Sequence, residues 1–538
     1  MNFKTELALI EKVSQKALDR VLKKFATYTR NTLVLNQDQE KVIKNEFTLL
    51  KKSFTQHLLL SLKLAHEADE GKRRQKKRIA YLNIQMSQYR KQIRSVFPRA
   101  GLVWVLDGII FKNQIAGIKK LAGLPDEDGA VIDVLNSASS VSLGAENPWL
   151  IMADRVEDHL GIRDNICSAY HTGLRQGFVL KSLAELYPGN KKQALTVHTE
   201  SSGTIVDSIA IESCVAYAEK TFGGNTSRRI LAVDGTWAGG YGSAREGTGF
   251  GIDKQQVSRI GKNVWVDRCL PPPIKENGAQ FLSILKNKIK TGEIAGVYLE
   301  PDSIGDLGII IPDKNILKRM IELLMQYGIP VIADCVQQLG RTGGYWGENV
   351  EKILNRHPLL VVTTAKSASN GQPFGYVIMP KIIADAAYAL TQVTTNQMNG
   401  PLLRALVVAE ILRDSLIQKW LIQKGEDLEQ IALSYGLESG EKGLRGKFMN
   451  RGIYVGDNEK VKLVQIALLV EDGILVGALP QSIRYQPMLL DFSETNSLVA
   501  HIICRRVLKV LAGDISQEIK DIYKTMQGVA SGLARKNT

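Results

Sequence analysis

The chain has 538 residues, 44% of them apolar and 23% charged, so two or three folded units are expected and a disordered chain is excluded. No uncharged apolar run approaches the roughly 18–20 residues that span a bilayer, and the opening MNFKTELALIEKVSQK lacks the apolar segment of a secretory signal. The formal net charge is +14, and five dispersed cysteines without a CxxC pair favour reduced thiols in the cytoplasm over a disulfide framework.

The basic charge is concentrated in residues 1–97, which hold 21 Lys and Arg against 9 Asp and Glu, whereas the remaining chain holds 48 and 46. Two apolar runs recur there at helical spacing: Ile10, Val13, Ala17, Val21 and Phe25, and then Phe47, Leu50, Phe54, Leu58 and Leu62. They predict a basic helical extension of about three helices, interrupted near NQDQE and at EADEGKRRQKKR, with residues 98–130 as a connecting segment.

The run KRRQKKR allows several interpretations. It could form a solvated face, or it could bind an anionic membrane surface, RNA or an acidic partner. We favour the solvated face because no aromatic residues interleave the basic ones, and we expect no nucleic-acid partner.

From about residue 130 short β-rich runs alternate with helical stretches, which is typical of an α/β protein with a largely parallel sheet covered by helices on both faces. The expected strands are ALTVHTE, RRILAVDG, IAGVYLEP, IPVIADC, PLLVVTTA and GYVIMP, and two of the helices between them are DSIAIESCVAYAEKTF and NILKRMIELLMQYG. We expect this large domain to span residues 131–400 and to bind its ligand beyond the carboxyl ends of the strands.

A smaller α+β domain is expected over residues 401–538. A long helix, GPLLRALVVAEILRDSLIQKWLIQKG, leads into it. Within it KLVQIALLVEDGILV and SIRYQPMLLDFS look like strands, and SLVAHIICRRVLKVLAG looks like a final helix.

Polar or glycine-containing segments follow several of the expected strands. Ser201, Ser202, Gly203 and Thr204 lie between a strand and a helix, where free backbone N–H groups would hold a phosphate. The same Ser-Gly-Thr sequence is also an ordinary helix N-cap. Trp237 stands in the turn DGTWAGGYGS, either as a packing residue or as a platform for a flat ring.

Two charged residues complete this set, since Asp334 ends the strand IPVIADC and Lys366 directly follows PLLVVTTA. A buried acid needs a partner, and a cationic ring nitrogen is one that would gain about 1–3 pKa units from the pairing. A lysine at a strand end could cap the strand or extend to solvent, whereas a desolvated lysine beside a carbonyl compound forms a Schiff base. Their shared position at the strand ends predicts one common site.

The order of these segments resembles class III aminotransferases, the pyridoxal-phosphate enzymes of fold type I, from about residue 130 to 512. The resemblance rests on the following runs, in unbroken order: VIDVLNSASSVSLGAENP, YLEPDSIGDLGIIIPDKNILKRMIELLMQYGIPVIADCVQQLGRTGG, TTNQMNGPLLRAL and SIRYQPMLL. It implies a fold with a large cofactor-binding domain and a smaller C-terminal domain, and pyridoxal 5'-phosphate as the cofactor.

The resemblance also implies roles for individual residues. Lys366 would form the Schiff base with the cofactor and move protons at the substrate carbon, and Asp334 would keep the pyridine nitrogen protonated. Arg484 would hold a substrate carboxylate, with Asp306 in the place of a residue that shields this arginine. Contacts with the cofactor's ring and phosphate are implied for Ser202, Gly203, Thr204, Trp237, Val336 and Gln337. In this family a Thr from the second subunit of a homodimer completes the phosphate site, and here Thr395 or Asn396 is implied.

The chain departs from the family pattern at several positions. Cys335 replaces the usual Glu after the ring-binding Asp, Ile205 replaces the Glu after Ser-Gly-Thr, and GQPFG replaces a glycine-rich loop after the lysine. Ala138 stands where some members place an aromatic residue that selects the substrate, which implies a wider pocket. The substrate is therefore not inherited from the family.

The function that follows is an aminotransferase that moves an amino group between an amine or amino acid and an oxo-acid or aldehyde by a ping-pong mechanism. Another pyridoxal-phosphate reaction on the same fold, by a decarboxylase, racemase, aminomutase or lyase, is the alternative. A cofactor-binding regulator with a basic DNA-binding arm is a minor alternative, because residues 1–97 show no recognisable helix-turn-helix with a wing. Amino donor and acceptor stay open.

Overall fold

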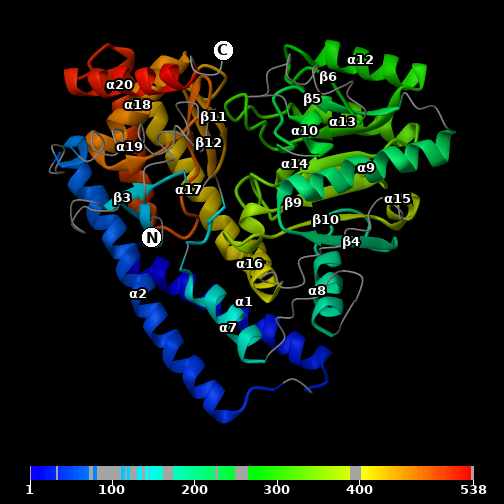
Figure 1. Ribbon diagram of the computed structural model, residues 1–538, viewed down its shortest axis with the longest axis horizontal. Helices are drawn as coiled ribbons and strands as arrows, with labels where there is room; N and C mark the ends of the chain where they lie inside the picture. The colour runs from blue at the N-terminus through cyan, green and yellow to red at the C-terminus, as the bar shows by residue number, and fades with distance from the viewer. Residues whose placement is uncertain are drawn as a thin grey trace.

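The computed structural model of the chain describes residues 2–31, 34–71, 77–80, 111–115, 118–121, 130–135, 140–144, 146–160, 174–223, 228–240, 242–248, 265–387 and 402–534. A seven-stranded sheet with its helices forms one lobe and the C-terminal elements form another (Figure 1). The first helix lies below them, and the second runs from the bottom of the molecule up the side of the C-terminal lobe (Figure 1). No helix among these residues is long and apolar enough to cross a bilayer.

The central sheet has the order β4-β10-β9-β8-β7-β5-β6. Its strands are β4 (Leu195–Glu200), β5 (Arg229–Val233), β6 (Val266–Leu270), β7 (Ile294–Leu299), β8 (Val331–Asp334), β9 (Leu360–Thr364) and β10 (Gly375–Pro380). All six expected strands are present, β6 is additional, and the pairs among β5 to β9 are parallel as predicted. Only β10 runs antiparallel to both of its neighbours.

Helices cover both faces of this sheet. Successive residues of a strand point to opposite faces, and the strand residues are apolar on both, so each face needs a covering layer. Ile332 packs in the core beneath α9 (Gly203–Phe222), whereas its neighbours Val331 and Ala333 pack in the core that includes α13 (Lys314–Gln326). The other helices of this lobe are α8 (Leu174–Ala184), α10 (Ala244–Gly247), α12 (Gly278–Thr291), α14 (Glu348–Lys352) and α15 (Lys381–Ala386), with 3-10 turns η2 (Leu354–Arg356) and η3 (Lys366–Ser369).

The expected long helix after residue 400 is two helices, α16 (Leu402–Arg413) and α17 (Ser415–Ser434). Asp414 separates them because its backbone is extended and its side chain accepts a hydrogen bond from Leu416 N, which starts a new helix. The predicted strand KLVQIALLVEDGILV is wrong over most of its length. It forms α18 (Asn458–Ala467), capped by Asp457, then the π-helical turn η4 (Leu468–Asp472) and only then the short strand β13 (Ile474–Leu475).

The C-terminal lobe contains a four-stranded sheet of order β11-β12-β15-β14. Its strands are β11 (Leu444–Lys447), β12 (Asn450–Tyr454), β14 (Gly477–Ala478) and β15 (Ser482–Tyr485), so SIRYQPMLL begins as the strand that was predicted. The expected last helix is α19 (Ser493–Leu511), and a further helix, α20 (Gln517–Ala534), follows it. A second sheet joins β1 (Phe111–Ile115), β2 (Ile118–Leu121) and β3 (Ala130–Asp133) to β13.

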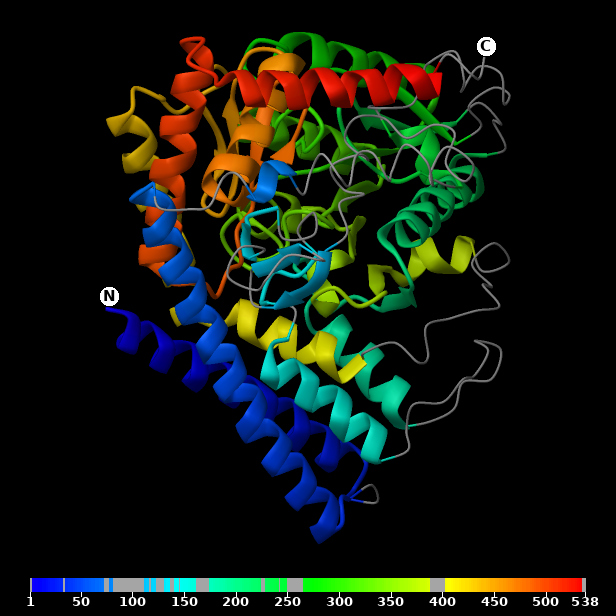
Figure 2. The ribbon, with the colours of Figure 1, turned by 60° about the vertical axis from the view of Figure 1, so that its left-hand side comes forward.

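The described part of the N-terminal extension forms α1 (Phe3–Tyr28) and α2 (Gln37–Asp69), separated at the expected NQDQE segment, where Asn36 caps α2. Most of the segment expected to form a third helix, residues 81–97, lies outside the described residues. Both helices lie beside α7 (Pro148–His159), and α1 also lies against α16 (Figure 2). The predicted α1 stripe from Ile10 to Phe25 is buried in the main core, and α2 contributes Phe54 to the same core. The extension is therefore part of the folded body.

The basic run that follows α2 is only partly described. Lys77 is exposed, as a solvated face predicts, but Arg78 is buried and donates a 3.1 Å hydrogen bond from Nη1 to the carbonyl oxygen of Val470. At least this end of the run has a structural role.

Candidate active site

A cavity of about 350 Å³ lies beyond the carboxyl ends of β8 and β9, beside the first turn of α9. The sequence predicted ligand binding at this edge of the sheet. Seven of the predicted site residues line the cavity: Ser202, Gly203, Thr204, Trp237, Val336, Gln337 and Lys366.

Lys366 begins the turn η3 immediately after β9, with a left-handed φ of 45°. Burial and the nearby Arg484 lower the pKa of its amine to about 8, against the opposing effect of Asp334 and other acids. Lys366 has no hydrogen bond to the described residues, so its amine is a nucleophile available to the cavity.

Buried hydrogen bonds fix the segment that follows Lys366. Ser367 Oγ lies 2.5 Å from Ser142 Oγ, and Arg341 Nη2 donates to the same Ser142 oxygen at 2.9 Å. Arg341 is fully buried and also donates to the carbonyl oxygen of Pro487 at 2.8 Å, which ties the lysine segment to the C-terminal lobe.

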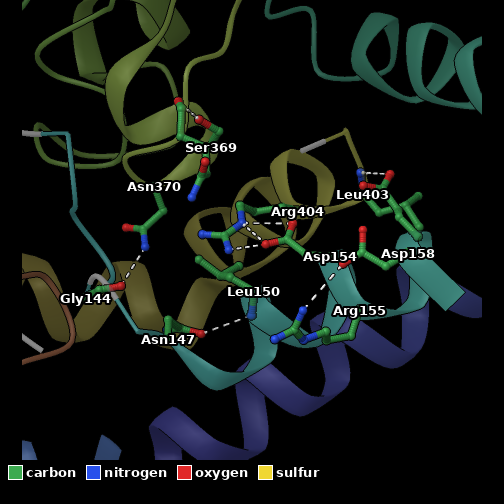
Figure 3. A network of polar contacts seen from close by, with 12 residues as sticks. Gly144, Asn147, Leu150, Asp154, Arg155, Asp158, Ser369, Asn370, Leu403 and Arg404 are labelled. Atoms are coloured by element: carbon green, nitrogen blue, oxygen red, sulfur yellow. Dashed lines mark hydrogen bonds and ion pairs between the residues drawn. The ribbon is translucent and has the colours of Figure 1, made fainter. Parts of the chain in front are cut away.

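Asn370, which ends η3 in a left-handed conformation, joins the lysine segment to the loop before α7 (Figure 3). Its Nδ2 donates to Gly144 O at 2.7 Å, and its Oδ1 accepts from Leu143 N at 2.7 Å. Further along, Arg404 of α16 forms an ion pair with Asp154 of α7, so the helices below the cavity are also joined by charge (Figure 3). The backbone carrying Lys366 is therefore held from two sides.

Asp334 is buried at the end of β8 and accepts two hydrogen bonds. Tyr298 donates its hydroxyl to Oδ2 at 2.5 Å, and the backbone N–H of Val336 donates to Oδ1 at 2.8 Å. Burial raises the pKa of Asp334 to about 6, while these donors and Lys366 oppose that rise. The carboxyl group is thus poised to ionise near neutral pH.

Two further acids were not among the predicted site residues. Glu300 is buried and accepts hydrogen bonds from the backbone N–H groups of Trp237 and Gly305, and burial together with Asp334 raises its pKa. Asp207 is buried on α9 and lines the cavity. It lies four residues after Gly203, so the helical repeat places it on the face that reaches the cavity, and this signal was available from the sequence.

The first turn of α9 leaves its backbone N–H groups available to an anion. Ser202 is the N-cap, but its side chain makes no capping hydrogen bond. A Cβ added to Gly203 would lie 3.2 Å from both Val336 methyl groups, and one added to Gly239 would collide with Thr204. Glycine therefore permits close packing around the helix start.

Trp237 lines the cavity and keeps 38% of its surface exposed, which leaves part of the indole available to a ring. On another wall Gln337 Oε1 accepts a 2.9 Å hydrogen bond from Nη1 of Arg484. Arg484 lies behind Gln337 rather than among the lining residues, and the buried Asp306 stabilises its charge. Ala138, Thr395 and Asn396 lie outside the described residues.

This arrangement combines a helix start without a side-chain cap, a partly exposed aromatic face, an available amine and, around the cavity, more carboxyl groups than cations. It fits a flat, phosphorylated ligand with a cationic ring nitrogen and a carbonyl carbon. Among the described residues, Asp207, Glu300, Asp306 and Asp334 contribute acid groups, against the two cations Lys366 and Arg484.

Comparisons with known proteins agree with this chemistry. The model of the class III aminotransferase family matches residues 119–504. An alanine/serine racemase from Pyrococcus horikoshii is 24% identical over 432 residues, covering 74% of this chain and 86% of the racemase. A putrescine aminotransferase from Pectobacterium atrosepticum is 25% identical over 468 residues, covering 83% of this chain and 88% of that enzyme. The solved structure of the omega-transferase from Vibrio fluvialis has a TM-score of 0.63 at 18% identity, covering 76% of this chain and 99% of that one.

Proposed function

This chain belongs to the class III aminotransferase family, and from that premise we propose that it is a cytoplasmic aminotransferase that moves an amino group between an amine or amino acid and an oxo-acid or aldehyde. Its cofactor is pyridoxal phosphate and its fold is that of the fold type I transferases. The observation that carries the proposed reaction is the amine of Lys366, which lines the cavity, has no hydrogen bond to the part of the chain that the structure describes, and has a pKa lowered to about 8.

The residues present fit the cofactor. The carboxyl group of Asp334 lies at the end of β8 behind the cavity lining and interacts with the amine of Lys366, and a cationic ring nitrogen would offset its negative charge. The uncapped N–H groups at the start of α9 suit the phosphate, with Ser202, Gly203 and Thr204 as the contact residues.

The cofactor would supply an aldehyde carbon that bonds an amine and a ring that draws electrons away from the substrate carbon. Lys366 would hold the cofactor covalently at rest and then carry a proton to or from the substrate carbon that bears nitrogen. Asp334 would hold the ring nitrogen's proton by its negative charge. Gln337 would donate its amide N–H to the ring hydroxyl while Trp237 and Val336 cover the two ring faces, and this would keep water from the reacting bond.

We place Arg484 in the substrate site as the group that binds a carboxylate. The support is that the planar guanidinium of Arg484 lies behind Gln337 and that the Nε of Arg484 has no partner among the described residues. Asp306, which also has an unpartnered oxygen, would stabilise this arginine when the substrate lacks a carboxylate. Ala138 remains the proposed position that widens the substrate pocket.

We propose that the protein is a homodimer with shared active sites. The support is the segment TTNQMNG, which is similar to the family segment that reaches the neighbour's phosphate and would contribute Thr395 or Asn396. Sedimentation that finds a fully active monomer would contradict this proposal.

Racemisation is a second candidate function, because an alanine/serine racemase is similar over 74% of this chain. Both reactions remove a proton from the substrate carbon, but only transamination leaves nitrogen on the cofactor. The deciding experiment mixes the purified protein with single amines and amino acids, without an acceptor, and follows the visible absorbance of the bound cofactor.

A transaminase loses that absorbance with its amine donor and regains it when an oxo-acid is added. A racemase retains the absorbance while the optical rotation of a chiral amino acid decays. Loss and recovery of absorbance with at least one donor and acceptor pair is the result expected here. Optical decay without net nitrogen transfer would replace the proposed reaction by racemisation.

A further inference from the structure

Among the described residues that line the cavity Asp207 is the one acid, and the proposed mechanism does not use it. It lies on α9 and is almost completely buried, with 1% of its surface exposed. An ionised carboxylate in such a place needs hydrogen-bond donors or a cation to stabilise its charge. The contacts of Asp207 therefore decide whether its carboxyl group is ionised or protonated.

Asp207 is linked to Asp334 through the sheet. Thr363 Oγ1 donates a 2.6 Å hydrogen bond to Asp207 Oδ1, and Thr363 lies directly opposite Asp334 in the parallel register of β8 and β9. Residues opposite each other in adjacent strands point to the same face of a sheet, so Asp334 and Thr363 both face α9. The two aspartates thus occupy one polar patch between the sheet and this helix.

The donors in this patch are divided unequally. Asp334 accepts from the Tyr298 hydroxyl and from the backbone of Val336, whereas the described residues give Asp207 only the Thr363 hydroxyl. Two carboxyl groups held close together in a buried place do not both ionise readily, and the one with more donors ionises first. Asp334 is that group.

The other charged groups that face Asp207 favour the same outcome. Burial and the charges of Asp334 and Glu300 raise the pKa of Asp207 well above its ordinary value, and Thr363 and Lys366 only partly oppose them. Tyr298, on β7, adds a neutral hydroxyl to the patch. Among the described residues the charge of Lys366 lowers the pKa of Asp207. The same charge also interacts with Asp334, Glu300 and Asp306.

We propose that Asp207 is a positioning residue that keeps its proton through the working pH range and thereby leaves Asp334 as the ionised carboxylate that faces the ring nitrogen of the cofactor. The neutral Asp207 accepts from Thr363 through Oδ1 and presents an O–H donor from Oδ2. It adds polarity to the α9 side of the site without adding a second negative charge. The inference deepens the proposed function, on which it rests for the identity of the ring.

The test compares wild type, Asp207→Asn and Asp334→Asn as cofactor-loaded full-length proteins by infrared spectroscopy between about pH 6 and 8, a range in which an ordinary aspartate with a pKa near 4 is ionised. A neutral carboxylic acid has a C=O stretching band that ionised carboxylates lack, and its shift in heavy water identifies it. Burial also raises the pKa of Glu300 and Asp302, which give bands of the same kind, so the assignment rests on difference spectra. The spectrum of wild type minus that of Asp207→Asn should contain one such band, and Asp334→Asn should retain that band. Asparagine resembles the protonated acid, so Asp207→Asn should keep cofactor affinity within about threefold, whereas Asp334→Asn should weaken it by about tenfold or more.

Three results would overturn the proposal: no neutral-acid band in the difference between wild type and Asp207→Asn, a band that disappears only in Asp334→Asn, or equal losses of cofactor affinity in the two variants. If Asp207→Asn does not fold, Thr363→Val takes its place, because losing the Thr363 hydrogen bond should move the Asp207 band to higher frequency. An unmoved band would then refute the assignment. The infrared readout needs no turnover, so a failed amino-transfer assay leaves it interpretable.

Discussion

Two lysines with lowered pKa values, Lys366 and Lys424, show how the catalytic cavity differs from the junction between the N-terminal helices and the rest of the chain. Burial lowers the pKa of both Lys366 and Lys424 to about 8. Lys424, however, donates hydrogen bonds to the backbone oxygens of Leu489 at 2.8 Å and Asp491 at 2.7 Å, and its amine lies 4.0 Å from the centre of the Trp420 ring. Lys366 has no such partner among the described residues and faces a cavity.

The acids near each lysine differ in the same way. At the junction Glu6 of α1 accepts from the Trp420 indole at 3.3 Å and from Ser493 N at 3.0 Å, and Asp491 accepts from Ser61 of α2 at 3.1 Å. At the junction each charged group therefore has hydrogen-bond partners, and these contacts hold α1 and α2 to the C-terminal lobe. Around the cavity the acids Asp207, Glu300, Asp306 and Asp334 outnumber the cations Lys366 and Arg484, although only Asp207 and Lys366 line it. A lowered pKa alone thus does not distinguish a reactive lysine from a structural one. The distinction here is that the amine of Lys366 faces a cavity without a partner among the described residues, whereas the amine of Lys424 is hydrogen-bonded.

Exchanging each lysine for methionine should separate the two roles most strongly. Lys366→Met should keep the fold, because it removes a buried cation without breaking a hydrogen bond, but it should lose turnover by about four orders of magnitude, or ~5.5 kcal/mol in the activation barrier. Steady-state rates and a denaturant melt of the same preparation check both parts. Appreciable residual turnover would remove Lys366 from the chemistry.

Lys424→Met should have the opposite pattern. It leaves Glu6, Asp491 and two carbonyl oxygens without their buried cation, so the free energy of unfolding should fall by about 3–5 kcal/mol. The folded fraction should retain its cofactor absorbance and most of its turnover. Lys419→Met is the matched control, since Lys419 is exposed on the same helix and should change stability little. A Lys424→Met protein as stable as this control would show that the junction charges are not coupled.

Asp334→Asn should be much more damaging to turnover than Cys335→Ala. The amide preserves the shape of the side chain but cannot stabilise a charge on the ring nitrogen, and a loss of two pKa units there corresponds to about a hundredfold in rate, or ~2.7 kcal/mol. Cys335 is buried beside the same strand end but carries no charge, because burial raises its pKa. Similar rates for the two variants would mean that Asp334 is not the ring's partner.

Cofactor affinity should depend on pH through Asp334. Its pKa is raised from 3.8 to about 6, so the ionised form that holds a cationic ring is complete above that pH and is lost as pH falls through it. Affinity should be flat above about pH 6 and should fall by about tenfold per unit below it. Equilibrium titrations across this range measure the slope, and Asp334→Asn should remove it. An identical slope in wild type and variant would assign the titration to another group.

The fold was predictable to the extent that local patterns determine it. The strands that end at Asp334 and Glu200, and the strand before Lys366, consist of buried β-rich runs, and each forms where it was expected. The run KLVQIALLV was misjudged because a continuous apolar run fits a buried strand and a buried helix equally well. The N-cap Asp457 decided in favour of the helix.

For the candidate site, the sequence predicted residues beside strand ends and helix starts, but it did not predict the contacts that join distant segments. The contacts between Thr363 and Asp207 and between Arg484 and Gln337 join residues 156 and 147 positions apart, so no local pattern contains them. The same holds for Glu6, whose partners Trp420 and Ser493 lie at the other end of the chain. The apolar stripe predicted that one face of α1 would be buried, but it did not identify α7 and α16 as the helices on which this face packs.

The most direct test of the account is the identity of the lysine that holds the cofactor. The cofactor-loaded protein is reduced with borohydride, digested, and its labelled peptide sequenced by mass spectrometry. The label should lie on Lys366 alone and should be absent from Lys366→Met, while Lys424 should remain unlabelled despite its similar pKa. A label on Lys424 or any other lysine, with Lys366 unmodified, would contradict the assignment of this cavity as the active site.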